Sequence, residues 1–148
     1  MSKRNKSTFS VGPADWNIDQ QQLRNVRQRV FIEEQHVPIE LEWDGLDEEA
    51  LHLLAFDLQG HAIGCVRVLE GGSIGRMAVL AEWRKQGVGK ALLQSAIEVC
   101  RERGHRTISL SAQTHAIAFY ERAGFVVCSE EYPDAGIPHR DMRLELST

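Results

Sequence analysis

The stretch Arg84-Lys85-Gln86-Gly87-Val88-Gly89-Lys90 lies where a predicted strand ends and a predicted helix begins. The start of a helix presents free backbone N–H groups and the positive end of the helix dipole. Two glycines let the backbone approach an anion closely, and Arg84 and Lys90 add positive charge. The stretch therefore predicts a cradle for a phosphate or pyrophosphate group. An exposed basic turn fits the same residues and stays open at this point.

Two well-known phosphate-binding loops do not fit this stretch. A nucleotide P-loop needs a glycine five places before its last glycine and Ser or Thr after its lysine. Those places hold Arg84 and Ala91. The dinucleotide-binding pattern needs a third glycine where Leu92 stands. What remains is the shorter pattern Arg-x-x-Gly-x-Gly.

The residues around this loop alternate between helix and strand patterns. In chain order, the predicted elements are a helix over 19–35, strands over 51–56, 61–70 and 74–80, a helix over 90–103, a strand over 107–111, a helix over 116–122 that Thr114 caps, and strands over 125–131 and 140–146. A strand, a helix and a second strand over 74–111 imply one parallel pair inside a mostly antiparallel sheet. The predicted fold class is therefore α+β, in a mixed sense.

The composition indicates an ordinary single domain. A chain of 148 residues is long enough to bury a core, and we expect residues 13–148 to form that domain after a loosely ordered tail over 1–12. The formal net charge of -4 does not favour nucleic acid or an anionic membrane as a partner. No apolar run approaches the roughly 20 residues that span a bilayer.

Cysteine and histidine usage gives two further expectations. Cys65, Cys100 and Cys128 are odd in number and lie in apolar segments, which predicts reduced core residues. Since the N-terminus also lacks the apolar stretch of a secretion signal, we expect a cytoplasmic protein. The six histidines are scattered without zinc-type spacing, so no metal site is expected.

The loop and its flanks resemble one enzyme superfamily. Arg-x-x-Gly-x-Gly matches the CoA-binding signature Arg/Gln-x-x-Gly-x-Gly/Ala of the GNAT N-acetyltransferases, and the segments 74–79 (IGRMAV) and 118–125 (AFYERAGF) resemble the strand before the signature and the late helix after it. The resemblance covers roughly residues 23–146. Segments 30–35 (VFIEEQ), 52–54 (HLL), 111–113 (SAQ) and 136–139 (GIPH) are similar to the ElaA- and YjcF-like branch.

The resemblance implies a twisted, mostly antiparallel sheet with one central parallel pair flanked by helices. It implies transfer of an acetyl or short acyl group from acetyl-CoA or another acyl-CoA to an amine acceptor, by direct attack without a covalent acyl-enzyme. The acceptor is a small molecule or a protein amine. The strand over 74–80 would pair with the pantetheine amides and splay away from the strand over 107–111. A homodimer is common for this fold, so self-association is also an expectation.

The resemblance also proposes site residues. Those expected to contact the cofactor are Met77, Ala78, Val79, Arg84, Lys85, Gln86, Gly87, Val88, Gly89, Lys90, Gln113 and Tyr120. Tyr120 matches the family tyrosine near the CoA sulfur, where its hydroxyl, of ordinary pKa about 10, would protonate a thiolate whose thiol has a pKa of about 8.5. The amide of Gln113 would bind acceptor or cofactor, or else close the turn that follows it. Arg76, inside its strand, needs a partner if it is buried.

A base is needed because most amines are protonated at neutral pH. The candidates are Glu33, Glu34, His52, His139 and Asp141, of which we put forward His139 and Glu34. Spacing singles out none of them. A water relay, or an acceptor that arrives neutral, removes the need for any.

Two other functions fit the same residues. One is a non-catalytic module that senses acyl-CoA, since fold does not fix function; the other is a nucleotide-binding protein. The acidic run over 40–49 suits a cationic acceptor, although charge runs are commonly solvated faces.

Overall fold

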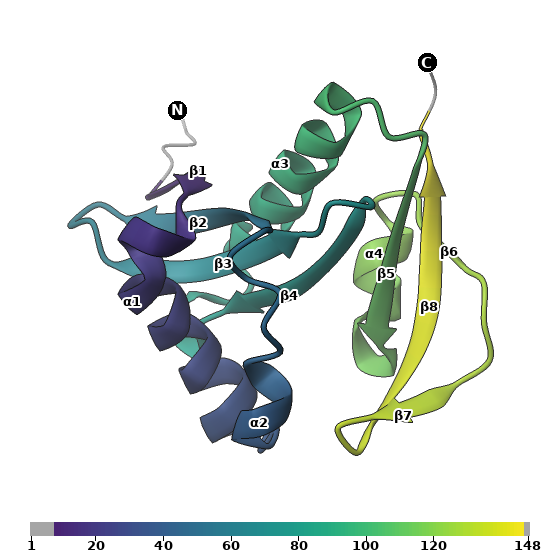
Figure 1. Cartoon of the computed structure of the whole chain (residues 1–148), viewed down its shortest axis with the longest axis horizontal. Helices are drawn as coiled ribbons and strands as arrows, with labels where there is room; N and C mark the ends of the chain where they lie inside the picture. The colour runs from purple at the N-terminus through teal and green to yellow at the C-terminus, as the bar shows by residue number, and fades with distance from the viewer. Residues whose placement is uncertain (1–7, 147–148) are drawn as a thin grey trace.

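The computed structural model describes residues 8–146 (Figure 1). Its elements, in chain order, are β1 (Phe9–Ala14), α1 (Trp16–Arg27), the π-helix η1 (Gln28–Glu34), α2 (Ile39–Glu42), β2 (Leu51–Asp57), β3 (Ala62–Val68), β4 (Ser73–Val79), the 3-10 helix η2 (Ala81–Trp83), α3 (Val88–Glu102), β5 (Thr107–Gln113), the 3-10 helix η3 (Thr114–Ala116), α4 (Ile117–Glu121), β6 (Val126–Val127), β7 (Tyr132–Asp134) and β8 (Ile137–Glu145).

The strands form one sheet with the order β1-β2-β3-β4-β5-β8-β6, and β7 pairs with β8. Among residues 8–146, β4 with β5 is the one parallel pair, and the other pairs are antiparallel. The prediction of a mixed α+β fold with a single parallel pair is confirmed.

The parallel pair is short, and this shapes the middle of the sheet. Only Ser73 with Ser109 and Ile74 with Leu110 are in register, although β4 runs on to Val79 and β5 to Gln113. Beyond Ile74 the two strands diverge, as Figure 1 shows. The splay that the family resemblance implied is therefore present.

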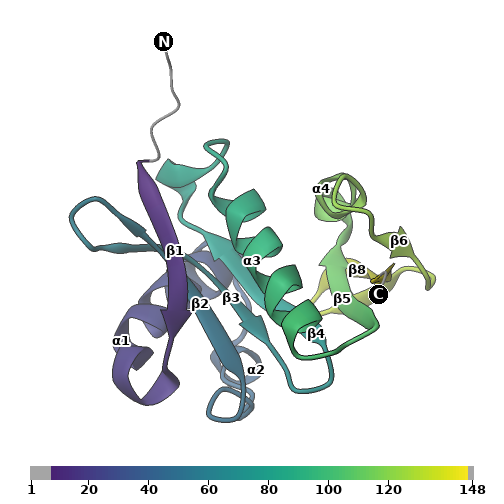
Figure 2. The ribbon, with the colours of Figure 1, turned by 90° about the horizontal axis from the view of Figure 1, so that it is seen from above.

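Helices cover both faces of the half of the sheet that contains β3 (Figure 2). On one face α3 approaches so closely that a Cβ on Gly64 would lie 3.0 Å from Leu92 and 3.2 Å from Val88. The buried residues of α3 are Val88, Leu92, Leu93, Ala96 and Cys100. On the other face lies α1, which Asp15 caps by accepting a hydrogen bond from the Asn17 N–H at 2.7 Å.

Strand β1 corrects the expectation of a loose tail over residues 1–12. It pairs with β2 from Phe9 opposite Asp57 to Ala14 opposite His52. The strand contains Gly12 and Pro13, which read as loop residues, but an edge strand tolerates them because one side of its ladder is unpaired. The rest of the predicted tail, residues 1–7, lies outside the described residues.

Three further expectations are corrected. The helix expected over 19–35 is α1 followed by the π-helix η1, and the strand expected over 125–131 shrinks to the two residues of β6. Neither η3 nor α4 has a side-chain cap within the described residues, so Thr114 does not cap. Cys65 and Cys100 are buried as predicted, but Cys128 is exposed.

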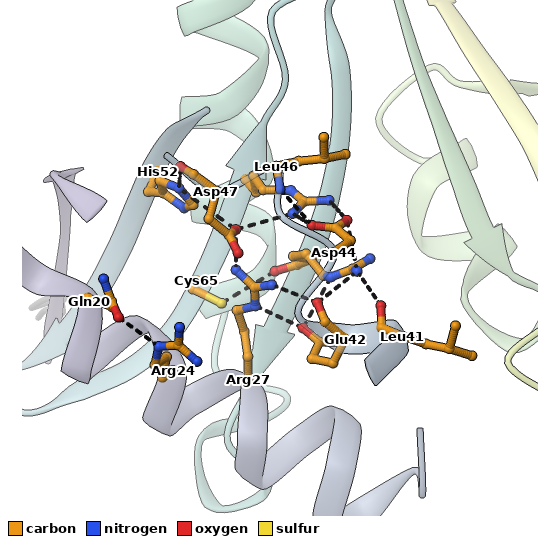
Figure 3. Close-up of polar contacts among 12 residues, drawn as sticks. Gln20, Arg24, Arg27, Leu41, Glu42, Asp44, Leu46, Asp47, His52 and Cys65 are labelled. Atoms are coloured by element: carbon orange, nitrogen blue, oxygen red, sulfur yellow. Dashed lines mark hydrogen bonds and ion pairs between the residues drawn. The ribbon is translucent and has the colours of Figure 1, made fainter. Parts of the chain in front are cut away.

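A buried ion-pair network ties α2 and the loop after it to the sheet (Figure 3). Arg27 of α1 binds Glu42 at 2.8 Å and Asp47 at 2.6 Å. The other two arginines, Arg67 and Arg76, bind Asp47, Asp44 and Glu42 at 2.9 to 3.1 Å. Three cations thus meet three carboxylates, which compensates the cost of burying them.

The network answers two questions left by the sequence. Three of the six acidic residues in the run over 40–49, namely Glu42, Asp44 and Asp47, bind the protein's own arginines. That part of the run is therefore not a solvated face.

His52 is 2% exposed and its Nε2 lies 2.9 Å from the Asp47 carbonyl oxygen. His52 therefore belongs to the core, with its Nε2 engaged by the backbone, and is not retained as a candidate base. The same burial lowers the pKa of His52.

Replacing Arg27 by Met is expected to lower the free energy of unfolding by about 3–5 kcal/mol, because Glu42 and Asp47 lose a buried partner. Urea denaturation measures this. The control is Arg29→Met two residues along, whose ion pair with Glu82 is exposed and is expected to contribute less than about 1 kcal/mol. Equal losses in the two variants would contradict a special role for the buried network.

Candidate active site

The predicted cradle lies at the first turn of α3. The helix begins at Val88, two residues earlier than expected, with Gly87 as its N-cap at a φ of 88°. Gly87 has no side chain with which to cap the helix, and the first hydrogen bond of the turn runs from the Ala91 N–H to the Gly87 carbonyl at 3.0 Å. The N–H groups of Val88, Gly89 and Lys90 therefore remain available to an anion.

The side chains of the loop fall into two groups. Lys85, which has a φ of 65°, and Lys90 are exposed, so their ammonium groups add positive charge beside the free N–H groups. Val88 is 1% exposed and belongs to the core, so its contribution is its backbone N–H. Gln86 donates from Nε2 to the Glu82 carbonyl at 3.2 Å, which holds the loop in shape.

The side chain of Arg84 binds two residues outside the loop, Glu34 and Val79. Its Nη1 and Nη2 donate to the two carboxylate oxygens of Glu34 at 2.6 and 2.7 Å, and its Nε donates to the Val79 carbonyl at 3.0 Å. Arg84 thus fastens the loop to η1 and to the end of β4. Its hydrogen bonds lower the pKa of the Glu34 carboxyl, which makes Glu34 a weaker base than an unpaired glutamate.

Helix α4, which carries Tyr120, packs against the same end of α3. The ring of Phe119, the neighbour of Tyr120, lies 3.5 Å from where a Cβ on Gly89 would be, so α4 packs against the first turn of α3. The Tyr120 ring makes edge contacts with Phe119 at 5.1 Å and Phe125 at 6.0 Å between centroids. Burial raises the pKa of Tyr120 to about 12, so its hydroxyl keeps its proton throughout the neutral range.

Gln113 and His139 lie together on the other side of the splay. They are cross-strand neighbours on β5 and β8. Gln113 exchanges two amide hydrogen bonds with Gln35, at 2.8 and 3.3 Å, and so links β5 to the segment after η1. His139 is 8% exposed, with Nδ1 2.7 Å from the Ile137 carbonyl. A neutral ring that donates from Nδ1 there keeps a free lone pair on Nε2.

Sequence reasoning missed one member of this region. Tyr132 on β7 stacks on His139, with ring centroids 6.2 Å apart, and its hydroxyl hydrogen-bonds Ser111 and Asp141. The signal that could have placed Tyr132 in this region is the hairpin formed by β7 and β8. Its two-residue loop, Ala135-Gly136, has φ values of 53° and 77°, as a type I′ turn requires.

Comparison with known proteins identifies the family. A family model described as an acetyltransferase (GNAT) domain matches residues 17–146. The chain belongs to the GNAT acetyltransferase family. The N-acetyltransferase YjcF of Bacillus subtilis, named as uncharacterised, is 37% identical over 130 residues, which cover 84% of this chain and 93% of YjcF.

Two solved structures agree with this GNAT assignment. ElaA of Escherichia coli has a TM-score of 0.83 at 26% identity, covering 93% of this chain and 99% of ElaA. An acyl-CoA N-acyltransferase from Pseudomonas aeruginosa has a TM-score of 0.80 at 31% identity, covering 92% and 99%. The likeness to the ElaA- and YjcF-like branch is thereby confirmed.

GNAT acetyltransferases move an acyl group from acyl-CoA to an amine, so this chain is an acyl-CoA-dependent N-acyltransferase with acyl-CoA as its co-substrate. At the start of α3, a Cβ on Gly89 would lie 3.5 Å from Phe119 of α4 and 3.7 Å from Val79 of β4, the strand that diverges from β5. Among the residues described, no group of three His, Cys, Asp or Glu side chains is arranged to hold a metal ion. Within 8–146, no helix is long and apolar enough to cross a membrane.

Proposed function

We propose that this enzyme transfers an acetyl or short acyl group from CoA directly to an amine, with both substrates bound at once. The observation that carries the proposal is the set of free N–H groups at Val88, Gly89 and Lys90 beside the splay of β4 and β5. The pyrophosphate would accept from these groups, with Lys85 and Lys90 adding charge.

The thioester would lie along β4. Beyond Ile74 this strand has no partner in β5. The Leu80 N–H donates to Ile63 of β3, and Ala78 pairs with Cys65, so strand alternation turns Met77 and Val79 toward the open edge, where their backbone groups would meet the pantetheine amides. The carbonyl of Val79 already accepts from Arg84, so Val79 offers its N–H alone. An amine that enters between the strands then meets the thioester carbonyl without an acyl-enzyme.

Release of free CoA thiol over a panel of amines tests the proposal, with acetyl-CoA as donor and acceptors of different charge and size. Turnover with any of them supports an enzyme. Tight binding of acetyl-CoA without turnover on the whole panel would favour the alternative, a non-catalytic acyl-CoA sensor.

We assign Glu34 and Arg84 as a brace for the loop rather than as catalytic groups. Glu34→Gln is expected to weaken acetyl-CoA binding by no more than about 5-fold, because an exposed ion pair contributes up to about 1 kcal/mol. Calorimetry and the pH profile of kcat measure the effect. The matched control is Glu33→Gln, an exposed neighbour that hydrogen-bonds only Gln28 among the described residues. A loss of kcat above about 100-fold with normal binding would instead make Glu34 the base.

Compartment and assembly are further parts of the proposal. Free thiols, including the exposed Cys128, suit the reducing cytoplasm. A homodimer is proposed from the family resemblance, and sedimentation velocity at micromolar concentration tests it.

A further inference from the structure

Three hydroxyl and carboxyl side chains form a continuous hydrogen-bonded chain on β5, β7 and β8. The Tyr132 hydroxyl donates to Asp141 Oδ1 and also contacts Ser111 Oγ. A tyrosine has one hydroxyl proton, and here it points at Asp141. Ser111 is therefore the donor to Tyr132. The direction of the chain is fixed as Ser111 to Tyr132 to Asp141, and the Ser111 oxygen keeps lone pairs for a further donor.

Ser111 occupies a particular place in the splay. It follows Leu110, the last residue of β5 that pairs with β4, so it is the first side chain on β5 beyond the point of divergence. Leu110 and Ala112 point to the buried side, whereas Ser111 and Gln113 share the other face. Gln113 contacts Gln35 there, so Ser111 faces the side of the sheet that carries α1 and η1. Figure 2 shows α3 and α4 on the opposite side.

We propose that Ser111, Tyr132 and Asp141 form a proton relay that deprotonates a cationic amine acceptor as it enters the splay from the α1 side. This inference rests on the proposed function and names the groups that receive the proton. An N–H proton of the ammonium passes to Ser111 Oγ, the Ser111 hydroxyl proton passes to Tyr132, and the Tyr132 proton passes to Asp141. The ammonium becomes a neutral amine and the carboxylate becomes a carboxylic acid.

The proton balance closes with the acyl transfer. The neutral amine forms the C–N bond to the thioester carbon, the C–S bond breaks, and the thiolate takes the proton of Tyr120. The second amine proton leaves to solvent, which also reprotonates Tyr120. Asp141 is exposed and returns its proton to water. The net result is one amide, one CoA thiol and one released proton.

The surroundings of Tyr132 suit a relay. Burial and the Asp141 carboxylate raise the pKa of Tyr132, so it stays neutral and passes a proton by accepting one while it donates another. The other titratable groups that face it are His139, which stacks on the ring, and Asp134 on β7. Asp134 adds negative charge that favours a cation nearby.

The test compares acceptors of different basicity. Tyr132→Phe keeps the ring that packs on His139 and removes the hydroxyl that carries the proton. At pH 7, its kcat should fall at least about 100-fold with alkylamines, which are protonated, and should stay within about 3-fold of wild type with arylhydrazines or aromatic amines, which are neutral. Asp141→Asn should repeat this pattern. Calorimetry should show unchanged acetyl-CoA binding in both, which also reports correct folding.

Ser109→Ala is the matched control, because Ser109 is exposed on the same face of β5, two residues before Ser111, and lies outside the relay. It should match wild type with every acceptor. Equal losses with charged and neutral acceptors in Tyr132→Phe, or no loss in either variant, would overturn the relay. Wild-type enzyme without turnover on any amine would instead overturn the proposed function and the relay with it.

Discussion

Replacement of Tyr120 by Phe is expected to lower kcat for acetyl transfer by about 100-fold or more while the affinity for acetyl-CoA stays the same. The reason is the missing proton donor for the departing thiolate. Because burial raises the pKa of Tyr120 to about 12, the hydroxyl remains protonated up to that pH and acts as an acid. The pH profile of the wild type should therefore show no loss of kcat through ionisation of Tyr120 between pH 7 and pH 10.

Steady-state kinetics and calorimetry on the Tyr120→Phe variant separate the chemical step from binding. The ring contacts with Phe119 and Phe125 persist in the variant, so its melting temperature should match that of wild type. A kcat equal to that of wild type would make Tyr120 a packing residue. A loss of acetyl-CoA binding would show that its hydroxyl contacts the cofactor and not only the leaving sulfur.

Replacement of Gly87 by Glu is expected to weaken acetyl-CoA binding by at least about 100-fold. The residue has a φ of 88°, where an L side chain costs on the order of 1–2 kcal/mol. The new carboxylate would also sit at the N-terminus of α3, where it competes with the pyrophosphate for the free N–H groups and repels it. Calorimetric titration with acetyl-CoA measures the loss.

Gly60→Glu is the matched control for this change. Gly60 has a φ of 86° in the turn between β2 and β3, and a side chain at either glycine would point into open space. Backbone strain is thus nearly the same, but only the change at Gly87 adds charge to the cradle. Equal loss of binding in both variants would show that strain, not the cradle, is responsible.

Titration of the wild type with ATP completes this experiment. If ATP bound as tightly as acetyl-CoA, the nucleotide-binding alternative would gain support and the pairing of pantetheine with β4 would lose it.

Patterns within short stretches of sequence predicted the elements that we propose hold the cofactor. The spacing of apolar residues in α3 and the glycines of the loop before it depend on neighbours in the chain, and both are present in the structure. Prediction from sequence patterns was wrong where a local signal and a tertiary contact disagree. Strand β1 contains Gly12 and Pro13, and it is a strand because β2 offers it an edge.

The sequence by itself therefore determined the fold class, the GNAT signature and the position of the glycine-containing loop at the start of α3, because each rests on residues that are close in the chain. Tertiary structure alone decided which charged and polar groups meet. It paired Arg84 with Glu34, 50 positions away in the sequence. It also brought Ser111 into contact with Tyr132, 21 positions away. Such pairs depend on strand register and on the approach of η1 to β4. The spacing of residues within a short stretch of sequence predicts neither the strand register nor the approach of η1 to β4. The free energy that selects these arrangements comes from packing the whole sheet.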